Sequence, residues 1–121
     1  MTTVVDPLRA PSVTFNKSGV SIATIETDGS SWPLPSLPGE TKVYLVSTTG
    51  SNVHPVLPAG VDTGDVVEAV SLDGSPGNDI GTASGESFVN IVPSDRTLAP
   101  FTSSITVRKV SSTGWAIIAF A

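Results

Sequence analysis

The sequence predicts an all-β fold, and three features support that prediction. Apolar and polar residues alternate with a period of two in several short stretches, as in strands that bury one face. The chain contains 11 glycines and 10 prolines, so turn residues interrupt it every few positions. Residues that favour helices, such as Leu, Lys, Glu and Arg, are few. We therefore expect a single antiparallel β-sandwich or small barrel of about seven or eight strands.

The chain is expected to divide into an extended N-terminal arm, residues 1–19, and a β-domain, residues 20–121. The arm contains Pro7 and Pro11 and shows little periodicity, apart from a short strand at residues 13–15. A chain end of this kind is either disordered alone or becomes ordered on a partner surface. The apolar side chains that it offers to a partner are Val4, Val5, Leu8, Val13 and Phe15.

The middle of the chain reads as short strands separated by turns and loops. Strands are predicted over residues 20–27, 42–48, 53–57, 65–72 and 87–92, and long loops over residues 75–86 and 93–100. Pro55 removes a backbone donor, which places residues 53–57 at the edge of a sheet. Three prolines in residues 30–39 predict a connector that lays Trp32 and Leu34 on the sheet.

The C-terminal stretch, residues 104–121, is predicted to form a hairpin that organises the fold. Its second arm places Trp115 and Ile117 on one side of the pleat, and Ile118 and Phe120 on the other. Seven residues are too few for a helix that spans a membrane. A domain of this size covers one face of such a strand with its own second sheet, and another chain is the simplest cover for the other face. Trp115, Ile117 and Phe120 are therefore candidates for a contact between chains.

Composition excludes several classes of function. The net charge of −5 and the scattered basic residues argue against binding to nucleic acid. The absence of cysteine removes disulfides, thiolate catalysis and cysteine-ligated zinc. The sequence shows no secretion signal and no long apolar run, so we expect synthesis in the cytoplasm and no membrane partner.

Motifs for catalysis or cofactor binding are also missing. His54 lies beside Pro55 without a nucleophile motif, so it is interpreted as a surface loop residue. Five residues supply hard oxygen ligands but lack the spacing of a calcium loop: Asp62, Asp65, Asp73, Asn78 and Asp79. A pair of carboxylates for sugar hydrolysis is not excluded, although nothing in the sequence selects one. We expect no enzyme activity, no metal and no cofactor.

Several stretches in order resemble the trimeric β-modules of tailed-bacteriophage virion proteins, which occur in capsid decoration proteins, head fibres and fibre tips. The resemblance covers residues 42–121, about two-thirds of the chain, and rests on residues 42–50, 56–60, 64–74, 88–92 and 113–118. Its distinguishing marks are Leu57-Pro58, Gly64-Asp65 and the late Gly114-Trp115. It implies a homotrimeric structural protein of the virion, without an active site.

Within that family, the expected function is that of a capsid decoration (cement) or head-fibre protein on the capsid surface. The arm would bind the major capsid protein, and Trp115, Ile117 and Phe120 would join three copies. One alternative is a tail-fibre module that binds cell-surface carbohydrate through the loop at residues 75–86. Another is a small carbohydrate-active enzyme or lectin, which would use the aromatic residues Trp32, Tyr44 and Trp115.

Overall fold

The structure is a computed structural model of the 121-residue chain, and it describes residues 12–17, 19–27, 32–48, 54–72, 78–91 and 96–121. These residues form strands and no helix, which confirms the all-β prediction. Accordingly, the described part of the chain holds no helix with the length and hydropathy to cross a membrane. The strands are β1 (Ser12–Lys17), β2 (Val20–Thr27), β3 (Trp32–Pro33), β4 (Thr41–Thr48), β5 (Pro55–Val56), β6 (Val66–Ser71), β7 (Asn78–Gly81), β8 (Ser87–Phe88), β9 (Leu98–Phe101), β10 (Ser104–Lys109) and β11 (Gly114–Phe120).

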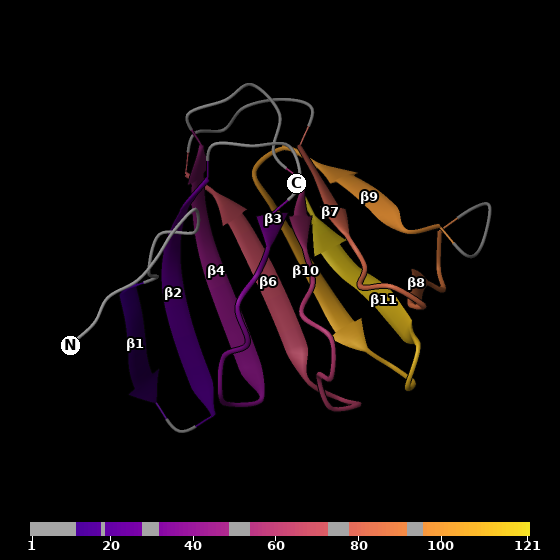
Figure 1. The fold of residues 1–121 in the computed structure, drawn as a ribbon, viewed down its shortest axis with the longest axis horizontal. Helices are drawn as coiled ribbons and strands as arrows, with labels where there is room; N and C mark the ends of the chain where they lie inside the picture. Colours follow the sequence, from indigo (N-terminus) through magenta and orange to yellow (C-terminus); the bar gives the residue numbers. More distant parts are fainter. Residues whose placement is uncertain (1–11, 18, 28–31, 49–53, 73–77, 92–95) are drawn as a thin grey trace.

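The strands form two sheets of different size (Figure 1). The large sheet has the order β1-β2-β4-β6-β10-β11-β8, and the small sheet has the order β3-β5-β7-β9. From β2 to β7 the chain passes alternately from one sheet to the other, and strands that follow each other within a sheet pair in parallel. The arrangement is solenoid-like, so the prediction of an antiparallel sandwich or barrel was wrong.

The coils of this solenoid differ in length. Val20 lies opposite Thr41, 21 residues later, and Thr41 lies opposite Val66, 25 residues later. Parallel strands need a long crossover, and here a short strand of the small sheet lies within each crossover in place of the usual helix. Because the coils are unequal, the sequence carries no fixed repeat that would reveal a solenoid.

The C-terminal part reverses the direction of the chain and closes the solenoid. Strand β10 is antiparallel to β6, and β11 is antiparallel to β10, which confirms the predicted hairpin. At the other end of the large sheet, β1 pairs with β2, so the sheet begins at Ser12, within the segment that was predicted as an arm. The edges of the large sheet are therefore β1 on one side and the short strand β8 on the other.

Several predicted boundaries need correction. The stretch at residues 53–57 was predicted as an edge strand, but β5 lies inside the small sheet between β3 and β7. Pro55 is tolerated there because the residues after it make the hydrogen bonds to both neighbouring strands. Val56 O accepts from Leu34 N, and Leu57 N donates to Gly81 O. The two predicted long loops each contain a strand, β7 and β9, while the strand predicted at residues 87–92 is reduced to β8.

The hydrophobic core lies between the two sheets. The large sheet contributes Tyr44, Val46, Val67, Ala69, Ile105, Val107 and Trp115, and the small sheet contributes Ile80, Ala99 and Phe101. The proline-rich connector packs on this core through Leu34, as the sequence predicts, while the side chain of Trp32 lies outside the described residues. The connector is also held by hydrogen bonds from Tyr44 Oη to Pro35 O (2.6 Å) and from Ser21 Oγ to Pro38 O (2.5 Å).

Tyr44 gives this core a measurable dependence on alkaline pH. Burial raises the pKa of Tyr44 above its usual range. The unfolded chain loses the phenol proton near pH ~10 while the folded chain keeps it, so stability falls as the pH rises above about 10. Tyr44 is the one tyrosine in the sequence, so phenolate absorbance reports this residue alone. We expect the native protein to develop this absorbance only as it unfolds, at a higher pH than the chain in urea.

The Tyr44→Phe variant is the control for this titration. It removes the ionisable group, so its stability should fall less steeply above pH ~10 than that of the parent chain. It should also be less stable at neutral pH by about 1 to 3 kcal/mol, because Pro35 O loses its donor. Coinciding titration curves for the native chain and the chain in urea would show that the phenol is not held in the core.

Candidate functional site

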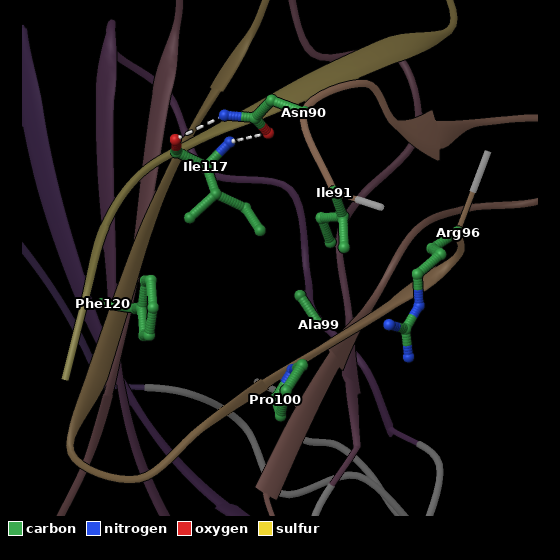
Figure 2. Close-up of a pocket in the computed structure, with 7 residues that line it drawn as sticks. All are labelled: Asn90, Ile91, Arg96, Ala99, Pro100, Ile117 and Phe120. Atoms are coloured by element: carbon green, nitrogen blue, oxygen red, sulfur yellow. Dashed lines mark hydrogen bonds between the residues drawn. The ribbon is translucent and has the colours of Figure 1, made fainter. Parts of the chain in front are cut away.

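A pocket of about 380 Å³ opens where the end of β11 faces β9 (Figure 2). Its lining residues are Asn90, Ile91, Arg96, Ala99, Pro100, Ile117 and Phe120. Most of these side chains are apolar, and Ile117 and Ile91 also pack against the hydrophobic core. The pocket is therefore an opening in the side of the core rather than a polar cleft on the outer surface.

Phe120 projects beside this opening and is 71% exposed, although it belongs to the core-facing side of its strand. It lies opposite Ile105, which is fully buried, and residues opposite each other in an antiparallel pair share a face. A second pocket, of about 310 Å³, is also lined by Phe120, together with Phe101 and Pro100. Among the residues that the structure describes, none covers this aromatic ring on the inner side of the sheet.

A β-bulge in β11 places Phe120 on this side. Val107 pairs with Ile117 and Thr106 pairs with Ala119, so Ile118 is an extra residue without a partner in β10. The extra residue returns Phe120 to the face that Ile117 occupies. The sequence pattern predicted opposite faces for these two residues, and that prediction was wrong because a simple period of two does not include a bulge.

The backbone edges on both walls of the pocket are partly blocked. The side chain of Asn90 accepts a hydrogen bond from Ile117 N and donates one to Ile117 O, each at 2.9 Å (Figure 2). Asn90 thus continues the ladder of β11 beyond the end of β8. On the opposite wall, Pro100 lies in the edge strand β9 and has no N–H to donate.

Arg96 brings a positive charge to the pocket. Its side chain is exposed, and its backbone O accepts a hydrogen bond from Phe88 N at 2.8 Å. Figure 2 shows Arg96 on the far side of the pocket from Phe120. A guanidinium group at the rim of an apolar opening favours a ligand that carries a carboxylate beside apolar groups.

The structure separates the three residues predicted to join copies. Ile117 and Phe120 line the same pocket. Trp115 is completely buried in its own chain, and its Nε1 donates to Glu86 Oε1 at 2.9 Å, so the indole has no surface left for a neighbour. Of the predicted arm residues, Val4, Val5 and Leu8 lie outside the described residues. Val13 and Phe15 lie in β1, and their side chains are likewise not among those described.

Two buried lysines were missed by sequence reasoning. Lys109 is 2% exposed, and its Nζ lies 3.3 Å from Glu86 Oε2, 3.4 Å from Val61 O and 5.2 Å from the centroid of the Trp115 ring. Lys42 Nζ lies 3.0 Å from Asp65 Oδ2 and also donates to Gly39 O. The alternation of faces along a strand could have predicted their burial, because each lysine lies two residues from a core residue and so faces inward.

Among the described residues, the remaining polar candidates are not gathered into a metal site, and Asp73 lies outside those residues. His54 Nδ1 lies 3.3 Å from Asp79 Oδ2, but the two groups are not aligned for a hydrogen bond. Both side chains are partly buried, and His54 lies in the loop before β5, where it was predicted. Asp65 is paired with Lys42. Within the ranges that the structure describes, no group of three or more His, Asp or Glu side chains is placed to hold a metal ion.

Comparisons with known proteins add no relative to these observations. No protein-family model matches the chain, and neither the curated proteins nor the solved structures include a significant match.

The buried pair of Lys109 and Glu86 is expected to stabilise the fold strongly. The Lys109→Met variant leaves the Glu86 carboxylate buried without its cation, so we expect the free energy of unfolding to fall by about 3 to 5 kcal/mol. Adding Glu86→Gln should restore part of this loss, because the glutamine amide keeps an oxygen that accepts from Trp115 Nε1. Urea unfolding followed by tryptophan fluorescence measures both effects. The Arg108→Met variant, at an exposed position of the same strand, is the matched control, and purely additive losses would contradict the pairing.

Proposed function

We propose that this chain is a structural protein of a tailed-bacteriophage virion. In this proposal it acts as a capsid decoration (cement) or head-fibre protein, which forms a homotrimer and binds the capsid surface through its N-terminal arm. The observation that carries the proposal is the exposed ring of Phe120 beside an opening in the core. One copy leaves this surface in water, and association of copies removes it.

The energetics favour association at this surface. Phe120, which lines the pocket, is 71% exposed, and two further apolar side chains of the facing strands are exposed outside the pocket lining, Ile118 in β11 (51%) and Leu98 in β9 (44%). Burying a large apolar side chain is worth about 1.5 to 3 kcal/mol, and a closed ring of three copies would gain this at each contact. We expect the contact to use Ile117 and Phe120, without Trp115.

The distinguishing residues of the phage resemblance lie close together in the fold. Leu57-Pro58 begins the turn that presents Val61 O to Lys109 Nζ. Gly64 N donates to Lys109 O at 2.7 Å, and Lys109 N donates to Asp65 O at 3.0 Å. The ring of Trp115 lies beneath the ammonium group. The marks therefore surround one buried lysine, which supports a likeness in scaffold rather than in an active site.

Carbohydrate binding has less support. Tyr44 and Trp115 are completely buried, so neither can stack on a sugar ring. The loop assigned to sugar binding at residues 75–86 contains β7, whose Asn78 and Ile80 are buried. These positions help to build the core instead of presenting side chains to a ligand.

Substitution of Phe120 tests the assembly. We expect the parent chain to be a trimer by light scattering coupled to size exclusion, and Phe120→Ser to be mostly monomeric because the shared apolar contact is lost. Leu72→Ser is the matched control, since Leu72 is 52% exposed but does not line the pocket, and it should remain trimeric. A parent chain that stays monomeric at high concentration would contradict the proposal.

Particles prepared with and without the chain test its role on the capsid. A protein that binds across neighbouring capsomers stabilises the assembled shell by mass action, so particles without it should break at a lower temperature. Adsorption to host cells should be the same for both preparations. Equal thermal resistance combined with weaker adsorption would instead indicate a host-attachment protein.

A further inference from the structure

We infer that the pocket beside Phe120 receives the N-terminal segment, residues 1–11, of a neighbouring copy, with the Asp6 carboxylate on Arg96. The inference rests on the proposed trimer and names the contact that holds it together. Four observations lead to it: the partly blocked edges of the pocket, its charge, the sequence of the segment, and the positions of β1 and the pocket in the large sheet.

The partly blocked edges make strand addition less favourable at the pocket. A peptide that adds a strand needs free N–H and C=O groups along an edge. At this opening the groups of Ile117 are taken by Asn90, and Pro100 offers no donor in β9. We therefore expect apolar side chains placed against Ile91, Ile117 and Phe120 to supply the main contact with a partner.

The positive charge of Arg96 at the rim further restricts the chemistry of a partner. Among the residues that the structure describes, no carboxylate lies within ion-pair distance of Arg96. The partner that fits best carries an acidic group next to apolar side chains. The whole chain is acidic, with a net charge of −5, so a neighbouring copy is a suitable source.

Within this chain, Val4-Val5-Asp6 has the required chemistry in a segment that precedes the first strand. Leu72-Asp73 is another combination of this type in the sequence, and Leu72 is 52% exposed. Leu72 N, however, donates to Val46 O at the end of the sheet, which fixes its backbone there. The N-terminal segment is therefore the better source of the bound residues.

The positions in the sheet favour a neighbouring copy over the same chain. Strand β1 lies at one edge of the large sheet, and β11 lies five strands away (Figure 1). At ~4.8 Å for each strand this is about 24 Å. Val5 precedes Ser12 by seven residues, which span at most about 25 Å when fully extended. The same chain would therefore reach its own pocket only with this segment almost fully extended across the sheet.

A contact from one edge of a copy to the opposite edge of the next is heterologous, and such contacts form a ring when the rotation between copies closes. A ring of three then places one N-terminal segment in each pocket. Val4 and Val5 serve the contact between copies in this arrangement, while Leu8, Val13 and Phe15 remain for the capsid. Assembly and capsid binding thus use different parts of the arm.

A charge exchange across the proposed contact tests the inference in solution. Arg96→Asp and Asp6→Arg should each raise the dissociation constant of the trimer about tenfold or more, and the combined variant should recover most of the loss. Arg108→Asp makes the same change at an exposed position outside the pocket and should have little effect. If Arg96→Asp behaves like Arg108→Asp, or if the combined variant shows no recovery, the inference is overturned.

Cross-linking identifies the copy that supplies the segment. Because the sequence has no cysteine, Val5→Cys with Pro100→Cys introduces the only two thiols in the chain and keeps Phe120 in place. Oxidation should give covalent dimers and trimers on a denaturing gel without reductant. A band of cross-linked monomer alone would overturn the assignment to a neighbour, as would efficient cross-linking of Leu72→Cys to Pro100→Cys with none from Val5→Cys.

Removal of residues 2–11 separates this inference from the proposed function. We expect the shortened chain to lose the trimer while it keeps the native tryptophan fluorescence. A shortened chain that remains trimeric overturns the inference and leaves the proposed trimer intact. A full-length chain that is monomeric overturns both.

Discussion

The ammonium group of Lys109 joins parts of the chain that are far apart in the sequence. It contacts the carboxylate of Glu86, the carbonyl oxygen of Val61 and the ring of Trp115, while its own backbone bonds to Gly64 and Asp65. A buried charge needs this number of partners, because its loss of hydration costs several kcal/mol. The turns between coils are therefore fixed by one strand residue, which gives the short solenoid a rigid end without a disulfide.

The sequence was sufficient to predict the long strands but not the way they connect. Strands β2, β4, β6, β10 and β11 each have six to eight residues, and their alternating apolar residues or, in β11, a continuous apolar run predict them well. The small sheet is built from strands of two to four residues, which are too short to show a period. The crossovers between the parallel strands pass through those short strands. The sequence pattern alone therefore could not distinguish a solenoid-like fold from an antiparallel sandwich.

Prediction of the candidate site was partial for a related reason. Ile117 and Phe120 were selected because both are apolar in a strand that has no polar face, and the structure brings them to one pocket. Trp115 satisfied the same criterion, yet its burial depends on Glu86, 29 residues earlier in the chain. Asn90 carried no recognisable signal, since a side chain that replaces a backbone partner looks like any loop asparagine.

The unpaired Ile118 also has an evolutionary meaning. A single inserted residue near the end of a strand reverses the faces of the residues after it and leaves the residues before it untouched. Trp115 stays in the interior, whereas the ring of Phe120 lies on the inner side of the sheet and is 71% exposed. One inserted codon is thus enough to move a terminal aromatic ring from the outer face of a sheet to its inner face, without any change in the interior around Trp115.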